Sequence, residues 1–157
     1  MPQIIPNLWF DTQALEAAEF YVSIFPSSKV TFVSRYPEGG DRAGEVLTVD
    51  FVLDGEQVTA INGGPQFTFD EAVSLLVDCA DQDEIDHYWD ALVAGGGEHG
   101  PCGWLKDKYG LSWQVAPNDV FIELAEGDPD RYARAMAAMM QMQKIDIAAM
   151  QAAADGA

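Results

Sequence analysis

The stretches NLWFDTQALEAAEFYVSIF (residues 7–25) and SLLVDCADQDEIDHYWDAL (residues 74–92) align without a gap when the sequence is shifted by 67 positions. Each begins with a short apolar run and reaches an aspartate, Asp11 in the first stretch and Asp78 in the second. Each then continues with apolar residues at the spacing of one helix face. The repeat therefore predicts two copies of a strand followed by a helix.

Further strand patterns follow each predicted helix. The first helix is followed by KVTFVSRYP and by EVLTVDFVLDGEQVTAI, where Asp54-Gly55 between alternating apolar runs predicts a hairpin. The second ends at AGGGEHG, and PCGWL and YGLSWQV then flank a turn from Asp107 to Gly110. The sequence thus predicts an α+β protein of two strand-helix-three-strand modules, neither of which can bury both faces of its sheet alone.

The two modules account for most of the chain. We expect one domain over residues 1–126, with the first module at about 1–66 and the second at about 67–126. Residues 127–157 are expected to form a separate C-terminal helical extension.

Helix-start signals support this extension. Asp128 is placed to cap a helix that has Pro129 in its first position, and Asp146 is placed to cap another. Methionines give the extension an adaptable surface, which would suit packing on its own sheet or docking on a partner subunit: Met136, Met139, Met140 and Met150. The sequence leaves both alternatives open.

Charge and composition restrict the partners. The chain has 26 acidic and 8 basic residues, and its formal net charge of -18 opposes binding to nucleic-acid phosphates or anionic lipids. We therefore expect a neutral or cationic small molecule. The two cysteines, Cys79 and Cys102, are too few for a disulfide framework, and the sequence shows no signal-peptide pattern. No apolar run approaches the roughly 20 residues that are needed to cross a bilayer. A cytoplasmic protein is expected.

Four motifs in this order resemble the PhnB-like branch of the vicinal oxygen chelate superfamily: LWFDTQALEAAEFYVSIFP, DGEQVTAINGGPQFTF, SLLVDCADQDEIDHYWDAL and KDKYGLSWQVAP. That superfamily includes glyoxalase I, bleomycin-resistance proteins and extradiol dioxygenases. The resemblance covers essentially the whole chain, and the tail RAMAAMMQMQKIDIAAMQAA resembles a C-terminal extension of this branch. It implies a homodimer with cupped mixed sheets, in which modules pair within a chain or are exchanged between subunits.

The resemblance also implies where a metal would bind. Active members use two ligands from the first strands of the modules and two from later strands, and these positions correspond here to Asn7, Ser74, Thr48 and Gln114. Amides and hydroxyls are weak substitutes for imidazole, carboxylate or thiolate ligands. We therefore expect no metal cofactor, and the alternative is a hard divalent ion held weakly with help from Asp50.

Strand alternation provides a separate indication of the site. Alternate residues of four strands form a more polar face, which we interpret as the cavity lining: Asn7, Trp9, Thr48, Asp50, Ser74, Leu76, Ser112 and Gln114. The apolar residues between them are expected to lie under the helices. Among the aromatic residues, Trp9 and Phe67 are the expected ligand contacts.

The leading hypothesis is a homodimeric, metal-independent protein that binds a small molecule through Asn7, Trp9, Thr48, Ser74, Gln114 and Phe67. The alternative is a small-molecule lyase, isomerase or dioxygenase that uses a weakly held metal, or Asp50 as a base if burial raised its pKa. A third possibility is that the dimer surface itself is the function, if the cup were filled by its own side chains.

The sequence bears on two further chemistries. A methyltransferase is disfavoured, because the glycine run Gly95 to Gly97 follows a helix instead of joining a strand to a helix. His99 and Cys102 lie close in the sequence and would form an activated nucleophile if they met in space; the plainer alternative is a surface loop.

Overall fold

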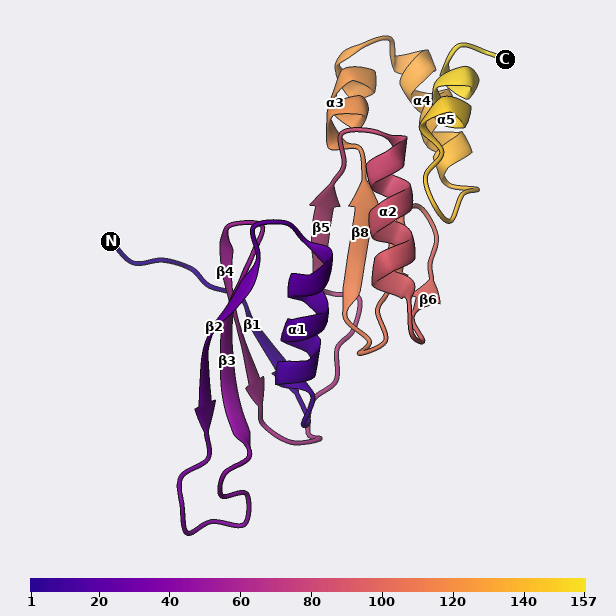
Figure 1. Ribbon diagram of the computed structural model, residues 1–157. Helices are drawn as coiled ribbons and strands as arrows, with labels where there is room; N and C mark the ends of the chain where they lie inside the picture. Colours follow the sequence, from indigo (N-terminus) through magenta and orange to yellow (C-terminus); the bar gives the residue numbers. More distant parts are fainter. The chain divides into compact units, whose positions relative to one another are not determined.

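The computed structural model describes all 157 residues, which divide into two compact units, Met1–Phe69 and Asp70–Ala157. Each unit contains one four-stranded mixed sheet, and the chain has five helices in all (Figure 1). The predicted α+β architecture with a helical C-terminal part is confirmed.

The first unit forms the predicted strand-helix-three-strand module. Its elements are β1 (Asn7–Phe10), α1 (Ala14–Ile24), β2 (Lys29–Arg35), β3 (Val46–Leu53) and β4 (Glu56–Asn62). The strand order is β1-β4-β3-β2, with β1 parallel to β4 and the other pairs antiparallel. Helix α1 packs along this sheet (Figure 1).

The hairpin between β3 and β4 turns where the sequence predicts it. Asp54 and Gly55 both have positive φ, 47° and 87°, which is the left-handed geometry of a tight hairpin turn. Glycine adopts this conformation without steric cost, and aspartate tolerates it better than most residues. The Asp-Gly pair therefore sets the register of the hairpin.

The core of the first unit lies between α1 and one face of its sheet. Val49, Phe51 and Leu53 alternate along β3 and are buried, and the Phe51 ring lies 6.4 Å from the ring of buried Tyr21 in α1. The buried side chain of Asn62, at the end of β4, accepts a 2.8 Å hydrogen bond from the backbone of Ala14 and so holds the start of the helix. This arrangement leaves the opposite face of the sheet without a helix.

The second unit repeats the module with shorter strands. It contains β5 (Ser74–Asp78), α2 (Gln82–Val93), β6 (Glu98–His99), β7 (Trp104–Lys106) and β8 (Ser112–Ala116), in the order β5-β8-β7-β6. Strand β5 is parallel to β8, as β1 is to β4. Asp81 caps α2 by accepting a hydrogen bond from the backbone of Glu84. The short β6 falls in a segment that the sequence analysis assigned to a loop.

A buried carboxylate organises the turn between β7 and β8. Asp107 is only 3% exposed and accepts hydrogen bonds from the backbone of Tyr109 (2.8 Å), the backbone of Leu111 (3.1 Å) and the indole Nε1 of Trp113 (2.9 Å). A buried charge is tolerated when hydrogen bonds of this kind satisfy it. The turn and the core tryptophan are thereby fixed to each other.

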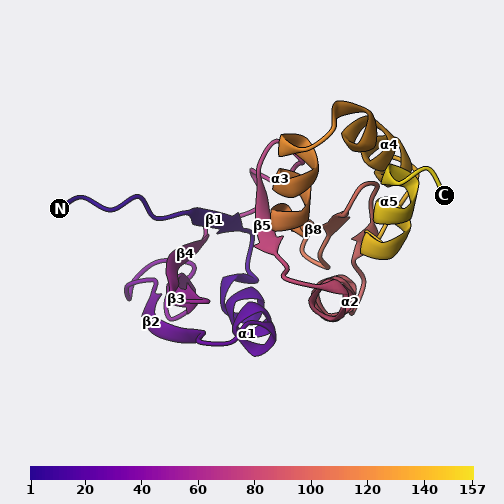
Figure 2. The same cartoon turned by 90° about the horizontal axis from the view of Figure 1, so that it is seen from above.

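Three helices complete the second unit: α3 (Asn118–Glu126), α4 (Pro129–Met139) and α5 (Ile147–Ala154). Asp128 caps α4 and Asp146 caps α5, as predicted. Helices α4 and α5 lie side by side (Figure 2). Helix α3 is not predicted from the sequence, because Pro117 at its start makes no side-chain capping bond and so gives no helix-start signal. None of the five helices combines the length and apolar character needed to traverse a bilayer.

Candidate functional site

The open face of the first sheet carries four of the predicted site residues. The strand register places Asn7 beside Thr59 and Thr59 beside Asp50, and a second row runs from Trp9 through Ile61 to Thr48. Side chains paired in this way point to the same side of a sheet. Asn7, Trp9, Thr48 and Asp50 therefore share the face opposite α1, as strand alternation predicts.

The surroundings of these residues differ. Trp9 Nε1 donates a 2.9 Å hydrogen bond to the carbonyl of Gly64, and the Phe67 ring packs edge-on against Trp9 at 5.0 Å. Phe67 remains 64% exposed, so this aromatic pair is available to a ligand. Thr48 Oγ1 lies 2.5 Å from Ser34 Oγ and shares a hydrogen bond with it.

Asn7 and Asp50 are both exposed. The hypothesis that Asp50 is a general base requires burial of its carboxylate, and the chain does not bury it. The roles of both residues stay predictions.

The open face of the second sheet carries the remaining predicted positions. One row of paired residues runs across it from Ser74 through Ser112 and Lys106 to Glu98. A second row runs from Leu76 through Gln114 to Trp104. The residues between them in sequence, such as Val115 and Leu105, are buried on the side of α2. Ser74 and Gln114 therefore lie on one face together with side chains that the sequence analysis did not assign to the site.

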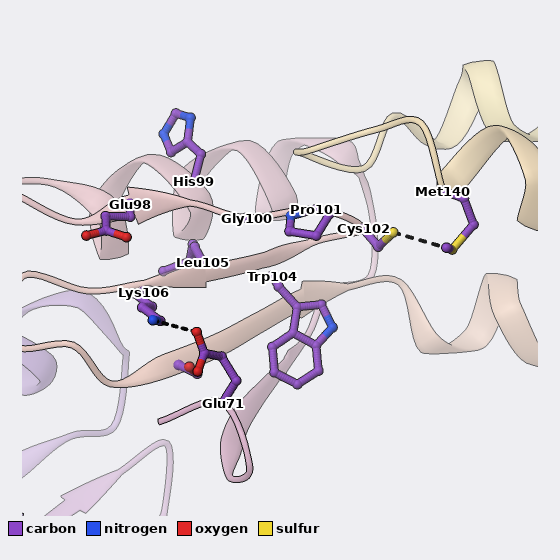
Figure 3. A pocket seen from close by; sticks show the side chains of 11 residues that line it. Glu71, Glu98, His99, Gly100, Pro101, Cys102, Trp104, Leu105, Lys106 and Met140 are labelled. Atoms are coloured by element: carbon purple, nitrogen blue, oxygen red, sulfur yellow. Dashed lines mark hydrogen bonds and ion pairs between the residues drawn. The ribbon is translucent and has the colours of Figure 1, made fainter. Parts of the chain in front are cut away.

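A cavity of about 570 Å³ opens on this face, within the range of about 300–1,000 Å³ that is usual for small-molecule sites. Figure 3 shows Glu98 and the paired Lys106 and Glu71 toward one end, with Trp104 between them and the sulfur atoms at the other end. Its lining is drawn from β6, β7, β8 and the segments beside them: Glu71, Glu98, His99, Gly100, Pro101, Cys102, Trp104, Leu105, Lys106, Ser112 and Met140.

An ion pair marks the charged end of the cavity. Lys106 Nζ lies 2.5 Å from Glu71 Oε1. The hydrogen bond from Lys106 holds the pKa of the Glu71 carboxyl below its ordinary value, and Glu71 in turn raises the pKa of Lys106. Both groups are therefore charged at neutral pH. Glu98 adds a second carboxylate, so the charged side chains at this end sum to one negative charge.

A buried hydroxyl in the cavity lining has no hydrogen-bond partner. Ser112 is only 1% exposed, and its Oγ is the one buried side-chain polar atom of the chain without a partner. An unsatisfied buried hydroxyl costs about 1–3 kcal/mol in proteins. Such a group merits a functional explanation, because most buried polar groups are satisfied.

The positions that correspond to metal ligands do not suit a metal ion. Gln114 Nε2 donates a 2.9 Å hydrogen bond to Ser74 Oγ, so two of the four positions are already joined to each other. Thr48 is hydrogen-bonded to Ser34, and Asn7 supplies a neutral amide. No group of three or more His, Cys, Asp or Glu side chains is placed to hold an ion. A neutral set of hydroxyl and amide oxygens gives little to offset the dehydration of a divalent cation.

His99 and Cys102 do not meet. The His99 ring packs on Trp89 of α2, with the ring centroids 5.3 Å apart, and Figure 3 shows it pointing away from Cys102. The Cys102 sulfur instead lies 3.6 Å from the sulfur of Met140. The structure therefore provides no imidazole to activate this thiol.

Most of the lining residues were not assigned to the site from the sequence, among them Glu71, Glu98, Lys106 and Met140. Lys106 could have been found, because it alternates with Trp104 along one short strand and so shares its face. Glu98 lies in the strand that was taken for a loop. Met140 reaches the cavity from the helical extension, and no pattern in the sequence indicates that contact.

The chain has measurable similarity to known proteins. The sequence family described as 3-demethylubiquinone-9 3-methyltransferase matches residues 2–116. A solved structure from Bacillus cereus, described as a 3-demethylubiquinone-9 3-methyltransferase, PhnB protein, is 36% identical, with a TM-score of 0.65 over 74% of this chain and 99% of that one. No curated protein sequence matches the chain.

Two more distant structures share the fold. Protein PA1353 from Pseudomonas aeruginosa is 20% identical, with a TM-score of 0.62 over 74% of this chain and 98% of its own. The fosfomycin resistance protein FosX from Listeria monocytogenes, solved with Mn(II) and sulfate, is 13% identical, with a TM-score of 0.51 over 74% of this chain and 91% of its own. The family match stops at the end of β8, so helices α3 to α5 lie outside it.

Proposed function

We propose that this chain, which belongs to the PhnB-like family of the vicinal oxygen chelate superfamily, is a small-molecule binding protein. It holds its ligand in the cavity of the second unit, without a metal ion. The observation that carries this proposal is the cavity itself, which combines ligand-sized volume with the unpartnered buried hydroxyl of Ser112. Because this hydroxyl is buried, a ligand can hydrogen-bond it only when a lining side chain moves aside, and that bond would then remove the cost of leaving the group unsatisfied.

The other lining groups support the binding of an organic molecule. Trp104 presents a half-buried ring, and flat aromatic surfaces contribute both apolar contact and attraction for cations. The carboxylates and the ammonium at one end provide charged partners, while Pro101 and the sulfur-containing side chains provide an apolar end. Binding would be driven by apolar contact with Trp104 and given its orientation by the charged end.

Metal independence is part of the proposal. The Gln114–Ser74 hydrogen bond gives two of the four positions that correspond to metal ligands a different task, which is to join β8 to β5 through their side chains. A ligand in this protein would contact the side chains directly. The manganese named for FosX belongs to that protein, and at 13% identity it carries no inference about this one.

The methyl transfer in the description of the family is not carried over to this chain. The junctions between strand and helix, residues 11–13 and 79–81, contain no glycine. A methyl-donor nucleotide is usually held by a glycine-rich loop at such a junction in a doubly wound sheet. The proposed function is therefore binding, with the homodimer and the cytoplasmic location that the family resemblance and the two free cysteines favour.

The experiment is a ligand screen by ¹H–¹⁵N NMR on protein treated with EDTA. The reporter is the indole N–H signal of Trp104, assigned by its loss in Trp104→Phe. We expect organic ligands to shift this signal in the absence of metal, and to need higher concentrations to do so in Ser112→Ala, which lacks the hydroxyl. Hits that bind only after Mn²⁺ is added, or a screen with no hits, would overturn the proposal.

A further inference from the structure

The loop between α4 and α5 is held against the cavity by backbone hydrogen bonds. The backbone N–H of Cys102 donates to the carbonyl of Met142 at 2.8 Å, and that of Gly103 donates to the carbonyl of Gln143 at 2.7 Å. Gly103 has φ of +81°, and a Cβ there would meet Ile145 Cδ1 at 2.8 Å. Glycine suits this position because it adopts the positive φ without strain and leaves room for the Ile145 side chain.

The same loop is fixed to α2 on its other side. Gln82 uses both ends of its side-chain amide: Nε2 donates to the carbonyl of Ile145 at 3.0 Å, and Oε1 accepts from the backbone of Ile147 at 2.9 Å. Lys144 adds ion pairs of 3.2 Å to Asp86 and Asp90, which are partly exposed and contribute less. The extension is thus anchored by bonds that specify its position and is not a loosely attached tail.

The consequence of this anchoring is the placement of Met140. This residue follows the last residue of α4, and its sulfur lies 3.6 Å from Cys102 at the end of the cavity remote from the carboxylates (Figure 3). Met140 is 61% exposed, so it is accessible to a ligand. Methionine is flexible and polarisable, so it can pack against apolar groups of various shapes.

The charges of the cavity indicate what it would accept. Glu71 and Glu98 against the single Lys106 leave one net negative charge at one end, on a protein of formal net charge -18. The Trp104 ring between the two ends can face a cation or an alkyl chain. An anionic ligand would meet repulsion both from the lining and from the protein as a whole.

We infer that the C-terminal extension forms the apolar end wall of this cavity, so that the protein takes an organic cation carrying an apolar group and Met140 limits the length of that group. This inference rests on the proposed function and assigns a ligand class and a specificity-determining residue to its site. The cation lies toward Glu98, the apolar group runs past Trp104, and its end contacts Met140 and Cys102. The family match ends before α3, so this wall is a feature of the tail and not of the matched fold.

The test uses n-alkyltrimethylammonium ions from propyl to octyl, titrated calorimetrically into metal-free full-length protein. Alkyl carboxylates and alcohols of the same lengths serve as anionic and neutral controls. We expect the cations to bind best, with affinity rising with chain length to an optimum and then falling. Met140→Ala should move the optimum to longer chains and weaken the wild-type optimum about fourfold, because one buried methylene is worth about that factor.

Met136→Ala is the matched control, because it removes a methionine of α4 that does not line the cavity. It should leave the length profile unchanged. If the cations bind but Met140→Ala gives the wild-type profile, the inference is wrong and the proposed function stands. If only carboxylates or alcohols bind, the ligand class is wrong while the binding function stands. If no probe binds and the NMR screen is also empty, both are wrong.

Discussion

The substitution Ser112→Ala is expected to make the protein more stable and to weaken its binding of a ligand. The Ser112 hydroxyl is buried without a partner, and burial of such a group costs about 1–3 kcal/mol. Ser112→Ala removes the oxygen and keeps the small side chain. The free energy of unfolding without ligand should therefore rise by about 1–2 kcal/mol, after a small loss of packing contacts is subtracted.

The neighbouring serine provides a control of opposite sign. Ser74 is the register partner of Ser112 on β5, but its hydroxyl accepts a 2.9 Å hydrogen bond from Gln114. Ser74→Ala should therefore lower the free energy of unfolding by about 0.5–1.5 kcal/mol, the usual net worth of one hydrogen bond. Two serine-to-alanine changes side by side on one sheet are thus expected to shift stability in opposite directions.

The assay is urea denaturation followed by tryptophan fluorescence, with thermal unfolding as a second measure. For a chain of this length each kcal/mol corresponds to about 2–4 °C in the melting temperature. Ser112→Ala should also weaken binding of the best alkyltrimethylammonium probe or screening hit by about two- to tenfold, if the ligand hydrogen-bonds the hydroxyl. Loss of stability in Ser112→Ala, or a gain with unchanged affinity, would refute the reasoning that this hydroxyl is kept unsatisfied for a ligand.

Three further predictions concern single side chains. Asp107→Ala should lower the free energy of unfolding, measured by chemical denaturation, by about 3 kcal/mol, because three hydrogen-bond donors lose their buried acceptor. A decrease below about 1 kcal/mol would contradict this prediction. Burial raises the pKa of the Cys79 thiol from 9.0 to about 12. A thiol reagent at pH 8 should therefore modify only Cys102 in the folded protein, and two fast-reacting thiols would contradict this prediction. The free energy of unfolding should also fall as pH rises from 9 toward 12, because the Cys79 thiol then ionises more readily in the unfolded chain. Lys106→Met should raise the pKa of Glu71 toward its ordinary 4.5, as followed by carboxyl ¹³C NMR, whereas an unchanged value would mean that the ion pair does not form in solution.

Much of the fold could be read from local sequence signals. The Asp54-Gly55 turn was predicted because tight hairpins require left-handed backbone at both residues, and the structure has it. Asp128 and Asp146 cap the helices that they were predicted to cap. Strand alternation correctly separated Asp50 from Phe51, placing one on the open face and the other under α1. These features depend on neighbouring residues and therefore leave a local pattern.

The features that were missed depend on contacts between distant segments. Helix α3 begins without a side-chain cap, and its first backbone N–H instead bonds Asp78, 40 residues earlier. Met140 lies near Cys102 only because Gln82 and the backbone at Gly103 anchor the loop of the extension. Nothing in the local sequence of α4 indicates a cavity wall, so this end of the site could only come from the structure.

Two of the predicted site residues lie on the same sheet face as the cavity. Ser74 and Gln114 were placed together by analogy with metal-binding relatives, and they are joined by a hydrogen bond that the analogy did not suggest. The proposed ligand would lie beside this pair, nearer to Trp104 and Ser112. The sequence thus indicated the face of the second sheet on which the cavity opens, whereas the position and charge of the cavity on that face required the register of β7 and β8.

The most direct test of metal-independent binding is to follow the Trp104 indole N–H signal while hexyltrimethylammonium is added to EDTA-treated protein, and then to add Mn²⁺. The account predicts a saturable shift with one site per chain before any metal is present. It also predicts that Mn²⁺, which is paramagnetic, does not broaden this signal selectively. A signal that moves only after Mn²⁺ is added, or selective broadening that disappears in Gln114→Ala, would contradict the account and identify a metal site after all.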